Sequence, residues 1–220
     1  AYFQAFTNTY APVEKLQDLY YTALKQDGVV GLAIATRPDC LADDVLDLLQ
    51  EINRQTYLWV EMGLQSVHKK SSTLLNLQYN YDDFYSALLK LQERGIECCA
   101  HIILGLPGES REDMLDTART MASLPIQGVK IHLLHIMKGT ALAKMYEHQP
   151  FRMMAMDEYV ELLVDILEIL PASMVIHRLT GDSPRDLLIT PQWSLKKWEV
   201  LNSIDRRLQE RNSWQGKKAK

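Results

Sequence analysis

The sequence has few cysteines and no long apolar run, and both absences limit what the protein can be. Its 220 residues include three cysteines, Cys40, Cys98 and Cys99, whose spacing follows no disulfide or metal-binding pattern. So few scattered thiols suit a reducing compartment, and we expect a cytoplasmic protein. No apolar stretch approaches the roughly 18–20 residues that a bilayer-spanning helix needs, and no signal-peptide pattern is present.

An excess of positive charge is also missing. The chain has 24 Lys and Arg against 28 Asp and Glu, a formal net charge of −4, which excludes a globally basic nucleic-acid binder. A local basic patch remains compatible with these numbers, because residues 196–220 hold eight basic and three acidic side chains. The hydrophobic fraction of 47% is sufficient for one large domain with a buried core.

Apolar strand patterns alternate with amphipathic helical patterns along the whole chain. This order predicts a parallel sheet covered by helices, either an open doubly wound sheet or a barrel of the TIM type. No Gly-x-Gly-x-x-Gly follows the first strand, which weakens a dinucleotide-binding interpretation. The expected strands are 1–6, 29–35, 57–64, 96–104, 128–137 and 174–179. The expected helices are 13–25, 43–52, 70–77, 82–94, 111–124, one from about 141, 157–170 and 194–211.

Polar side chains inside the strands favour the barrel. Successive side chains of a strand point to opposite faces, so residues of one parity share a face. Buried charges are costly without partners, and a sheet packed by helices on both faces would rarely tolerate one in nearly every strand. A barrel lumen that opens on a ligand site would tolerate such charges. The residues that share such faces are Glu61, Gly63 and Gln65; Cys99, His101, Ile103 and Gly105; and Lys130, His132 and Leu134.

Each of these polar residues also has a structural interpretation. Glu61 could pair with Lys130 or with a nearby histidine inside the lumen. His101 is equally compatible with packing and with substrate contact. His132 and His135 are three apart on an expected strand, so they should face opposite ways and not ligate one metal.

The stretch from Cys98 to Ser110, CCAHIILGLPGES, is the centre of the pattern. It runs from a strand through a Gly-Leu-Pro-Gly turn into an acidic helix start. Glycines such as Gly105 lack a Cβ and let a ligand approach the backbone closely. A strand, a glycine turn and a helix start form a frequent small-molecule cradle, although an ordinary connection explains the pattern as well.

Three motifs occur together in a fixed order: residues 36–39 (TRPD), 60–67 (VEMGLQSV) and 101–109 (HIILGLPGE). This set resembles radical S-adenosylmethionine (SAM) enzymes, especially the branch that contains the elongator catalytic subunit. Residues 2–12 (YFQAFTNTYAP), 132–143 (HLLHIMKGTALA) and 178–182 (RLTGD) are similar to bacterial YhcC-like proteins. The resemblance covers essentially the whole chain.

The resemblance implies a fold and a chemistry. The fold is a partial TIM-type (βα)₆ barrel over residues 1–182, without its first strand and cluster loop, followed by a helical extension over 183–220. The chemistry is the reductive cleavage of SAM at a [4Fe-4S] cluster, which yields a 5′-deoxyadenosyl radical for hydrogen abstraction from a substrate. Kinship with the elongator subunit makes tRNA one candidate substrate, and a flavodoxin or ferredoxin is implied as the reducing partner.

The same resemblance assigns residues to the cofactor by position. Gln4 and the Thr7-Asn8-Thr9 turn are expected near the amino and carboxylate groups of SAM. Polar residues at 65 and 66 are expected at the ribose, and the 103–108 turn at the adenine. The full set of predicted SAM contacts is Gln4, Thr7, Asn8, Thr9, Thr36, Arg37, Glu61, Gln65, Ser66, Ile103, Gly105, Leu106, Pro107, Gly108, Leu134, His135 and Ile136. Gly105→Val is expected to abolish SAM binding with little effect on folding.

Two departures from the family pattern keep other interpretations open. The three-cysteine cluster motif is absent, and the three cysteines present lie elsewhere, so we expect a fragment whose cluster ligands lie outside these residues. Residues 76–80 (NLQYN) replace the usual Asn-Arg-Gly-His of elongator-type proteins. The alternatives are a cluster-free barrel lyase or isomerase that uses Lys130, His132 and Glu61 as acid–base groups, or a non-catalytic binding module.

Overall fold

The structure is a computed structural model, and it describes residues 1–219. Six strands form one sheet in the order β1-β2-β3-β4-β5-β7, and β6 and β8 form a second, two-stranded sheet. The order of the large sheet follows the order of the chain, as the alternating pattern predicts. Its strands are β1 (Tyr2–Phe3), β2 (Gly31–Thr36), β3 (Tyr57–Gln65), β4 (Glu97–Leu104), β5 (Gly128–Leu133) and β7 (Val175–Arg178).

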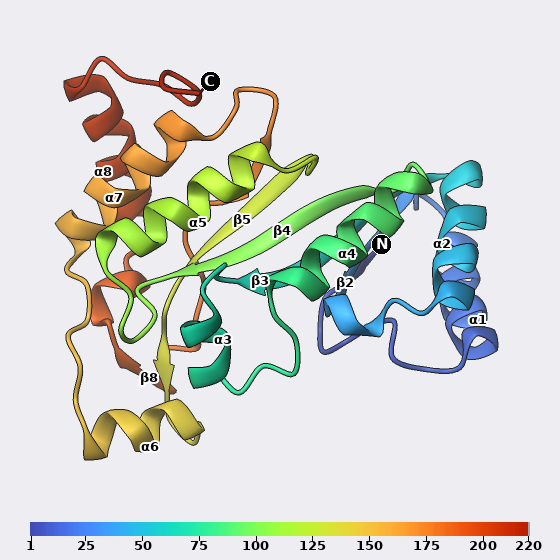
Figure 1. Cartoon of the computed structure of the whole chain (residues 1–220), viewed down its shortest axis with the longest axis horizontal. Helices are drawn as coiled ribbons and strands as arrows, with labels where there is room; N and C mark the ends of the chain where they lie inside the picture. The colour runs from blue at the N-terminus through green and yellow to red at the C-terminus, as the bar shows by residue number, and fades with distance from the viewer. Residues whose placement is uncertain (220) are drawn as a thin grey trace. The chain divides into compact units, whose positions relative to one another are not determined.

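The chain divides into two compact units, which we describe separately. The first unit comprises residues 1–101 with 125–129, and the second comprises 102–124 with the residues from 130 onward. The helices of the first unit are α1 (Val13–Leu24), α2 (Asp43–Gln55), α3 (Lys69–Leu74) and α4 (Tyr81–Glu93), with a 3₁₀ turn η1 (Pro38–Cys40). α1 and α2 lie side by side (Figure 1).

Parallel pairing sets the register of the first three strands. β1 pairs with β2 and β2 pairs with β3, both in parallel, and Ala35 lies opposite Glu61. The apolar face of α2 is buried as its spacing predicts: Val45, Leu46, Leu48, Leu49 and Ile52. A capping box starts α4, because the Asn80 side chain accepts hydrogen bonds from the backbone N–H groups of Asp82 and Asp83.

One tyrosine ties the turn after β1 to the first helix. Tyr20 of α1 is fully buried, its hydroxyl donates to the Asn8 carbonyl oxygen at 2.6 Å, and its ring lies 5.2 Å from that of Phe3. The Asn8 amide donates in turn to the carbonyl oxygens of Phe3 and Ala35, each at 2.9 Å. The turn is therefore fixed by side-chain bonds that the strand pattern alone does not contain.

The second unit contains the remaining helices. They are α5 (Arg111–Ser123), α6 (Ala141–His148), α7 (Met156–Ile169) and α8 (Lys197–Glu210), with a 3₁₀ turn η2 (Gln192–Leu195). α5 packs on α7, and α7 packs on α8 (Figure 1). α5 begins at the capping box of Ser110 and Asp113, in which the Ser110 hydroxyl accepts the Asp113 N–H and the Asp113 carboxylate accepts the Ser110 N–H.

The prediction of a single strand over residues 128–137 is wrong. β5 ends at Leu133, and Ile136–Met137 form β6, which pairs antiparallel with β8 (Leu188–Thr190), a segment that the sequence pattern placed in a loop. The chain changes partner here: the Leu134 N–H still donates to the Leu104 carbonyl oxygen at 2.9 Å, and two residues later the backbone bonds to β8.

This break also corrects the expected orientation of two histidines. His132 and His135 do not face opposite ways, because they do not lie on one continuous strand. A Cβ placed on Gly181 would be 3.3 Å from Cε1 of His135 and 3.8 Å from Nδ1 of His132. Both rings therefore lie against the same glycine.

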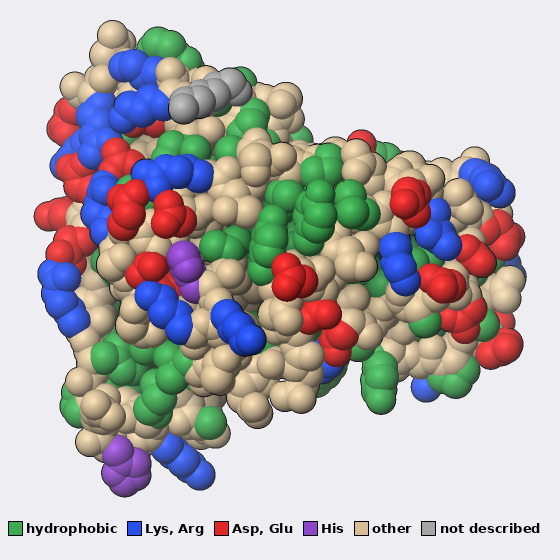
Figure 2. Space-filling view, viewed as in Figure 1, with side chains coloured by type: hydrophobic (Ala, Val, Ile, Leu, Met, Phe, Trp, Pro, Cys, Tyr) green, Lys and Arg blue, Asp and Glu red, His purple; other side chains and the backbone are tan. Residues whose placement is uncertain are grey.

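The basic C-terminal segment is largely neutralised by α7. Arg207 and Arg211 bond to Glu161, Arg211 also bonds to Asp165 at 2.7 Å, and Lys218 pairs with Glu168. Figure 2 shows blue and red side chains interleaved over α7 and α8. Arg207, Arg211 and Lys218 therefore hold this segment on α7, and their charges are compensated by its carboxylates.

The role of these ion pairs in holding the C-terminal segment on α7 can be tested at Glu168. It is 3% exposed and bonded to Ser213 and Lys218; burial alone would raise its pKa, but these two bonds lower it below the ordinary value. A lowered native pKa stabilises the fold above the unfolded-state value of about 4.3, and this contribution is lost as the pH falls through the native value. Glu168→Gln should therefore lower the free energy of unfolding by about 1 kcal/mol at pH 7, measured in urea.

The pH dependence and a surface control make this test specific. The difference between Glu168→Gln and the unchanged protein should shrink as the pH falls below the unfolded-state pKa of about 4.3, and it should vanish once the pH is below the lowered native pKa, where the carboxyl is protonated in both states. Glu199 pairs only with Lys196, at 2.9 Å, and both side chains are about half exposed or more. Glu199→Gln should change the free energy of unfolding by less than about 0.5 kcal/mol. An equal loss from both variants would contradict the docking role.

Candidate functional site

In the first unit, the turn after β1 meets the end of β2 through two buried threonines. The hydroxyls of Thr9 and Thr36 lie 2.5 Å apart, and Thr9 also donates to the Cys40 carbonyl oxygen at 2.5 Å. Both side chains are at least 94% buried. The sequence predicts both as SAM contacts, and the structure brings them together by bonding one to the other.

Arg37 lies beside this pair and is held by two neighbours. Its Nε donates to Asp39 at 2.9 Å, and its guanidinium carbon lies 6.0 Å from the centre of the Tyr79 ring. The hydrogen bonds and charge of Arg37 lower the pKa of Asp39, and the same bonds raise the pKa of Arg37. The guanidinium is thus fixed, charged and still 43% exposed, which leaves it able to contact an anionic group.

The end of β3 is conformationally strained. Gln65 adopts a left-handed backbone with φ +69°, which is uncommon for a residue other than glycine. Its side chain folds back over Gly63, where a Cβ would lie only 2.5 Å from Gln65 Nε2, and Nε2 is 3.5 Å from the Tyr79 hydroxyl. The Ser66 hydroxyl accepts the His68 N–H at 3.1 Å. Strained backbone of this kind is frequent at ligand sites, and it persists only where the surrounding structure stabilises it.

Glu61 is the most buried acidic side chain of this unit. It is 2% exposed, and its carboxylate lies 2.6 Å from the Tyr2 hydroxyl, 3.1 Å from Trp59 Nε1 and 3.1 Å from His101 Nε2. Tyr2 and His101 contact one carboxylate oxygen, and Trp59 contacts the other. The structure therefore joins Glu61 to His101, one of the two pairings that the sequence left open, and adds Tyr2 and Trp59.

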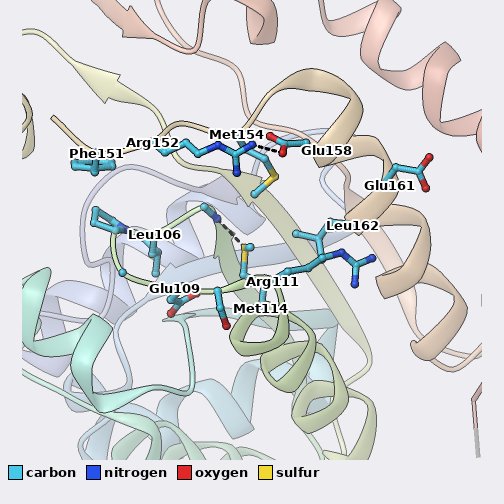
Figure 3. Close-up of a pocket in the computed structure, with 14 residues that line it drawn as sticks. Leu106, Glu109, Arg111, Met114, Phe151, Arg152, Met154, Glu158, Glu161 and Leu162 are labelled. Carbon is cyan, nitrogen blue, oxygen red and sulfur yellow. Dashed lines mark hydrogen bonds and ion pairs between the residues drawn. The ribbon is translucent and has the colours of Figure 1, made fainter.

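In the second unit, the turn after β4 lines a cavity of about 590 Å³. Gly105 and Gly108 have φ values of +85° and +79°, a conformation that side chains with a Cβ rarely adopt. Valine at residue 105 would therefore be strained, so the expectation that Gly105→Val leaves folding intact is wrong. The lining residues are Gly105, Leu106, Pro107, Gly108, Glu109, Ser110, Arg111, Met114, Phe151, Arg152, Met154, Glu158, Glu161 and Leu162 (Figure 3).

Two methionines reach into this cavity from opposite sides (Figure 3). The Gly105 N–H donates to Met114 Sδ at 3.1 Å, and Met154 lies against the open face of Gly105. Arg152 bonds to Glu158 at the rim. Neither methionine was among the predicted site residues: Met114 belongs to the helical pattern of α5, and Met154 lies just before α7.

A second set of buried polar atoms belongs to His135 and to the segment around Gly181, the glycine against which both histidine rings lie. His135 Nε2 and the hydroxyls of Thr180 and Ser183 are buried and have no hydrogen-bond partner within residues 1–219. Burial lowers the pKa of His135, and the nearby charge of Asp182 opposes this. Thr180 and Ser183 were missed as site residues by sequence reasoning, although Thr180 lies within the motif at 178–182 and Ser183 directly follows it. Buried atoms of this kind usually have a ligand or a water as partner.

A cluster does not fit the cysteines that are present. Cys98 and Cys99 are each 1% exposed, burial raises the pKa of the Cys98 thiol, and Cys40 lies on a different element. Within the described residues 1–219, no three His, Cys, Asp or Glu side chains gather closely enough to hold a metal ion. In the same part of the chain, every helix is too short or too polar to cross a bilayer.

Comparison with known proteins identifies the class. The family model of the radical SAM superfamily matches residues 6–121, and that of the Radical_SAM C-terminal domain matches residues 126–210. A solved structure of Elp3 from the archaeon Methanocaldococcus infernus, with residues 1–46 deleted, has a TM-score of 0.75. It is 21% identical, and the match covers 92% of this chain and 46% of that one. The chain belongs to the radical SAM superfamily and has its partial TIM-type barrel fold, as the sequence predicts.

Within the superfamily, two bacterial relatives are much more similar. YtqA of Bacillus subtilis is 52% identical over 217 residues, which are 99% of this chain and 67% of that protein. YhcC of Escherichia coli is 35% identical over 211 residues, or 96% of this chain and 68% of that one. The predicted kinship with YhcC-like proteins is confirmed. A tRNA uridine(34) acetyltransferase of Methanocaldococcus infernus is 26% identical over 183 residues, 33% of its length.

The predicted SAM contacts divide between the two units. In the first unit, Gln4 is exposed, Thr7 and Asn8 are half-buried, and Thr9 lies on Thr36 beside Arg37. In the second unit, Gly105, Leu106, Pro107 and Gly108 line the cavity, whereas Ile103 and the residues Leu134, His135 and Ile136 do not. Their contact with SAM stays a prediction.

Glu61 can be tested against a second glutamate of the same sheet. Gln keeps one acceptor oxygen and replaces the other with an NH2 donor, so Glu61→Gln removes the charge and forces either Trp59, or Tyr2 and His101, to change the hydrogen bonds that the carboxylate accepts. We expect the free energy of unfolding in urea to fall by about 1–3 kcal/mol. Glu97 accepts the Tyr57 hydroxyl at 2.5 Å in an exposed position, and Glu97→Gln should cost less than about 1 kcal/mol. Equal losses would mean that the buried network is not important for stability.

Proposed function

We propose that this chain is the SAM-binding part of a radical SAM enzyme. The observation that carries the proposal is the turn after β4: two left-handed glycines line a cavity of about 590 Å³ in a chain of this superfamily. The adenosyl group would lie against Gly105–Gly108 and Ile103, near the backbone of 134–136. In the first unit, Thr9, Arg37, Gln65 and Ser66 stay predicted SAM contacts.

The chemistry of the turn supports a nucleoside ligand without phosphates. The helix start that follows carries Glu112 and Asp113, and its capping box already engages the N–H groups of Ser110 and Asp113. Such a helix start repels phosphate, which usually binds where N–H groups are uncapped. Arg37, fixed by Asp39, offers a charged donor for a carboxylate.

The cluster is a separate part of the proposal. A [4Fe-4S] cluster, when bound, supplies the electron that cleaves SAM to methionine and a 5′-deoxyadenosyl radical. The cysteines of this chain do not fit such a cluster, so we propose that its ligands lie outside these 220 residues. A small electron-transfer protein such as flavodoxin or ferredoxin would reduce it. The described residues would bind and orient SAM and keep water from it.

We propose tRNA as the substrate class. The support is the relative named as a tRNA uridine(34) acetyltransferase, which matches 80% of this chain. The basic C-terminal segment adds little support for RNA binding, because its Arg207, Arg211 and Lys218 are paired with carboxylates of α7. An RNA surface would therefore have to lie elsewhere on the protein.

Gly105→Val tests the ligand site. The added side chain would block approach to the turn, and we expect binding of S-adenosylhomocysteine to weaken at least tenfold by calorimetry, about 1.4 kcal/mol. The variant should also lose about 1–2 kcal/mol of stability, because valine is strained at φ +85°.

A second glycine separates these two effects. Gly139 has φ +79°, and a Cβ there would meet no atom within 4 Å. Gly139→Val carries the same backbone strain away from the cavity, so it should lower stability and leave binding unchanged. Normal binding by Gly105→Val would place the adenosyl group elsewhere.

The substrate proposal needs the longer protein with its cluster reconstituted without oxygen. After reduction and incubation with SAM and unmodified tRNA, nucleoside analysis should show a modified base and release of 5′-deoxyadenosine. Release of 5′-deoxyadenosine without any change in the tRNA would reject tRNA and keep the enzyme class. No release from a reduced, cluster-loaded protein would reject the enzyme class as well.

A further inference from the structure

We propose that Met114 and Met154 occupy the two places on Gly105 that an adenine ring takes when it binds. Met114 holds the backbone N–H of Gly105, and Met154 covers the open face of this residue. Binding would displace both, so each methionine competes with the ligand. This inference rests on the proposed function, since it takes the adenosyl group to bind at this turn.

The N–H of Gly105 has an unusually weak partner. It donates to the thioether Sδ of Met114 at 3.1 Å. Backbone N–H groups nearly always bond to a carbonyl oxygen, a polar side chain or water, whereas a thioether is a poor acceptor. The neighbouring carbonyl, that of Leu104, accepts the Leu134 N–H at 2.9 Å in the ordinary way. An adenine ring nitrogen would give the Gly105 N–H a stronger bond than the sulfur does.

The face of Gly105 is covered by a movable side chain. A Cβ built on Gly105 would lie 3.6 Å from Met154 Cε and 3.9 Å from Leu134 Cβ, so the Met154 methyl group rests where a flat ring would pack. Met154 is half-buried, and methionine rotates easily about its unbranched side chain. The backbone beneath it is fixed, because Trp193 Nε1 donates to the Met154 carbonyl oxygen at 3.0 Å. The side chain can therefore leave while the segment stays in place.

The charges around the cavity select the ligand class. Arg152 bonds to Glu158, and Arg111 bonds to Asp165, so both arginines of the cavity are neutralised. Glu161, which also lines the cavity, is paired with Arg207 and Arg211. A phosphate would therefore meet carboxylates and arginines that are already paired with each other, without an arginine of the lining left to compensate its charge. The site therefore fits an uncharged or cationic adenosine derivative, and adenosine should bind more tightly than AMP.

If the ligand displaces the methionines, removing them should strengthen adenosine binding. If they only pack against the ligand as part of the cavity wall, removing them should weaken it, so the two cases can be told apart. If Met154 competes with the ring, Met154→Ala should strengthen adenosine binding by about threefold to tenfold, because the competent state is more populated. If Met114 competes for the N–H, Met114→Leu should strengthen it by about twofold to tenfold, because the free form loses a hydrogen bond. If either methionine packs against the ligand as a wall, its variant should weaken binding instead.

Titration of the methyl-¹³C-methionine-labelled chain with adenosine, followed by NMR, measures these affinities directly. The resonances of Met114 and Met154 should shift more than those of the other methionines. Two matched variants control for the loss of a methionine. Met153→Ala changes the adjacent residue, which does not line the cavity, and Met121→Leu changes a fully buried methionine of α5. Both should leave the affinity within about twofold of the unchanged chain.

The outcomes separate this inference from the proposed function. Stronger binding by Met154→Ala and Met114→Leu, with unchanged controls, supports displacement. Weaker or unchanged binding by both variants, with normal binding by the parent chain, overturns displacement and leaves the adenosyl site in place. If neither methionine resonance responds to adenosine or to S-adenosylhomocysteine in the parent chain, the adenosyl site itself is wrong and the inference falls with it.

Discussion

Parallel strand pairing is the constraint on which the site depends. Parallel strands end at the same edge of a sheet, so the residues that follow them become neighbours although they are far apart in the chain. In the first unit this pairing places Ala35 opposite Glu61 and Thr36 opposite Met62. The turn after β1 can then reach the end of β2, where Thr9 bonds to Thr36. A shift of one residue in the register would turn every one of these side chains to the other face.

The turn after β4 shows how the same arrangement makes room for a ligand. The strand delivers Gly105 to a cavity, and the left-handed backbone turns the chain into α5 without a side chain in the way. The space is not empty: sulfur and methyl groups of methionine lie against the glycine. Soft, mobile side chains are suited to cover a site of this kind, because they fill it at little cost and can move aside.

The sequence predicted the large elements and the face on which the polar residues lie. Long periodic segments such as α2 and α7 appear within a few residues of their expected bounds, since their apolar spacing is enforced by burial. The break after Leu133 and the strand β8 were not predictable from pattern. Residues 128–137 are apolar enough for one strand, and only the antiparallel partner β8 explains why the chain divides. The ion pairs of the C-terminal segment could not be predicted from its sequence either, because the carboxylates that pair with it lie on another element, α7.

The sequence by itself determined the class of fold and the candidate ligand residues, because strand and helix periodicity and an ordered set of motifs are local properties of the chain. Tertiary structure decided which of those residues touch. Glu61 bonds to Tyr2, Trp59 and His101. The rings of His132 and His135 lie against Gly181, and Met114 and Met154 both contact Gly105. Apart from Trp59, which lies on the same strand as Glu61, these contacts join residues of different strands, turns and helices, and the packing that joins them is not contained in any single stretch of sequence.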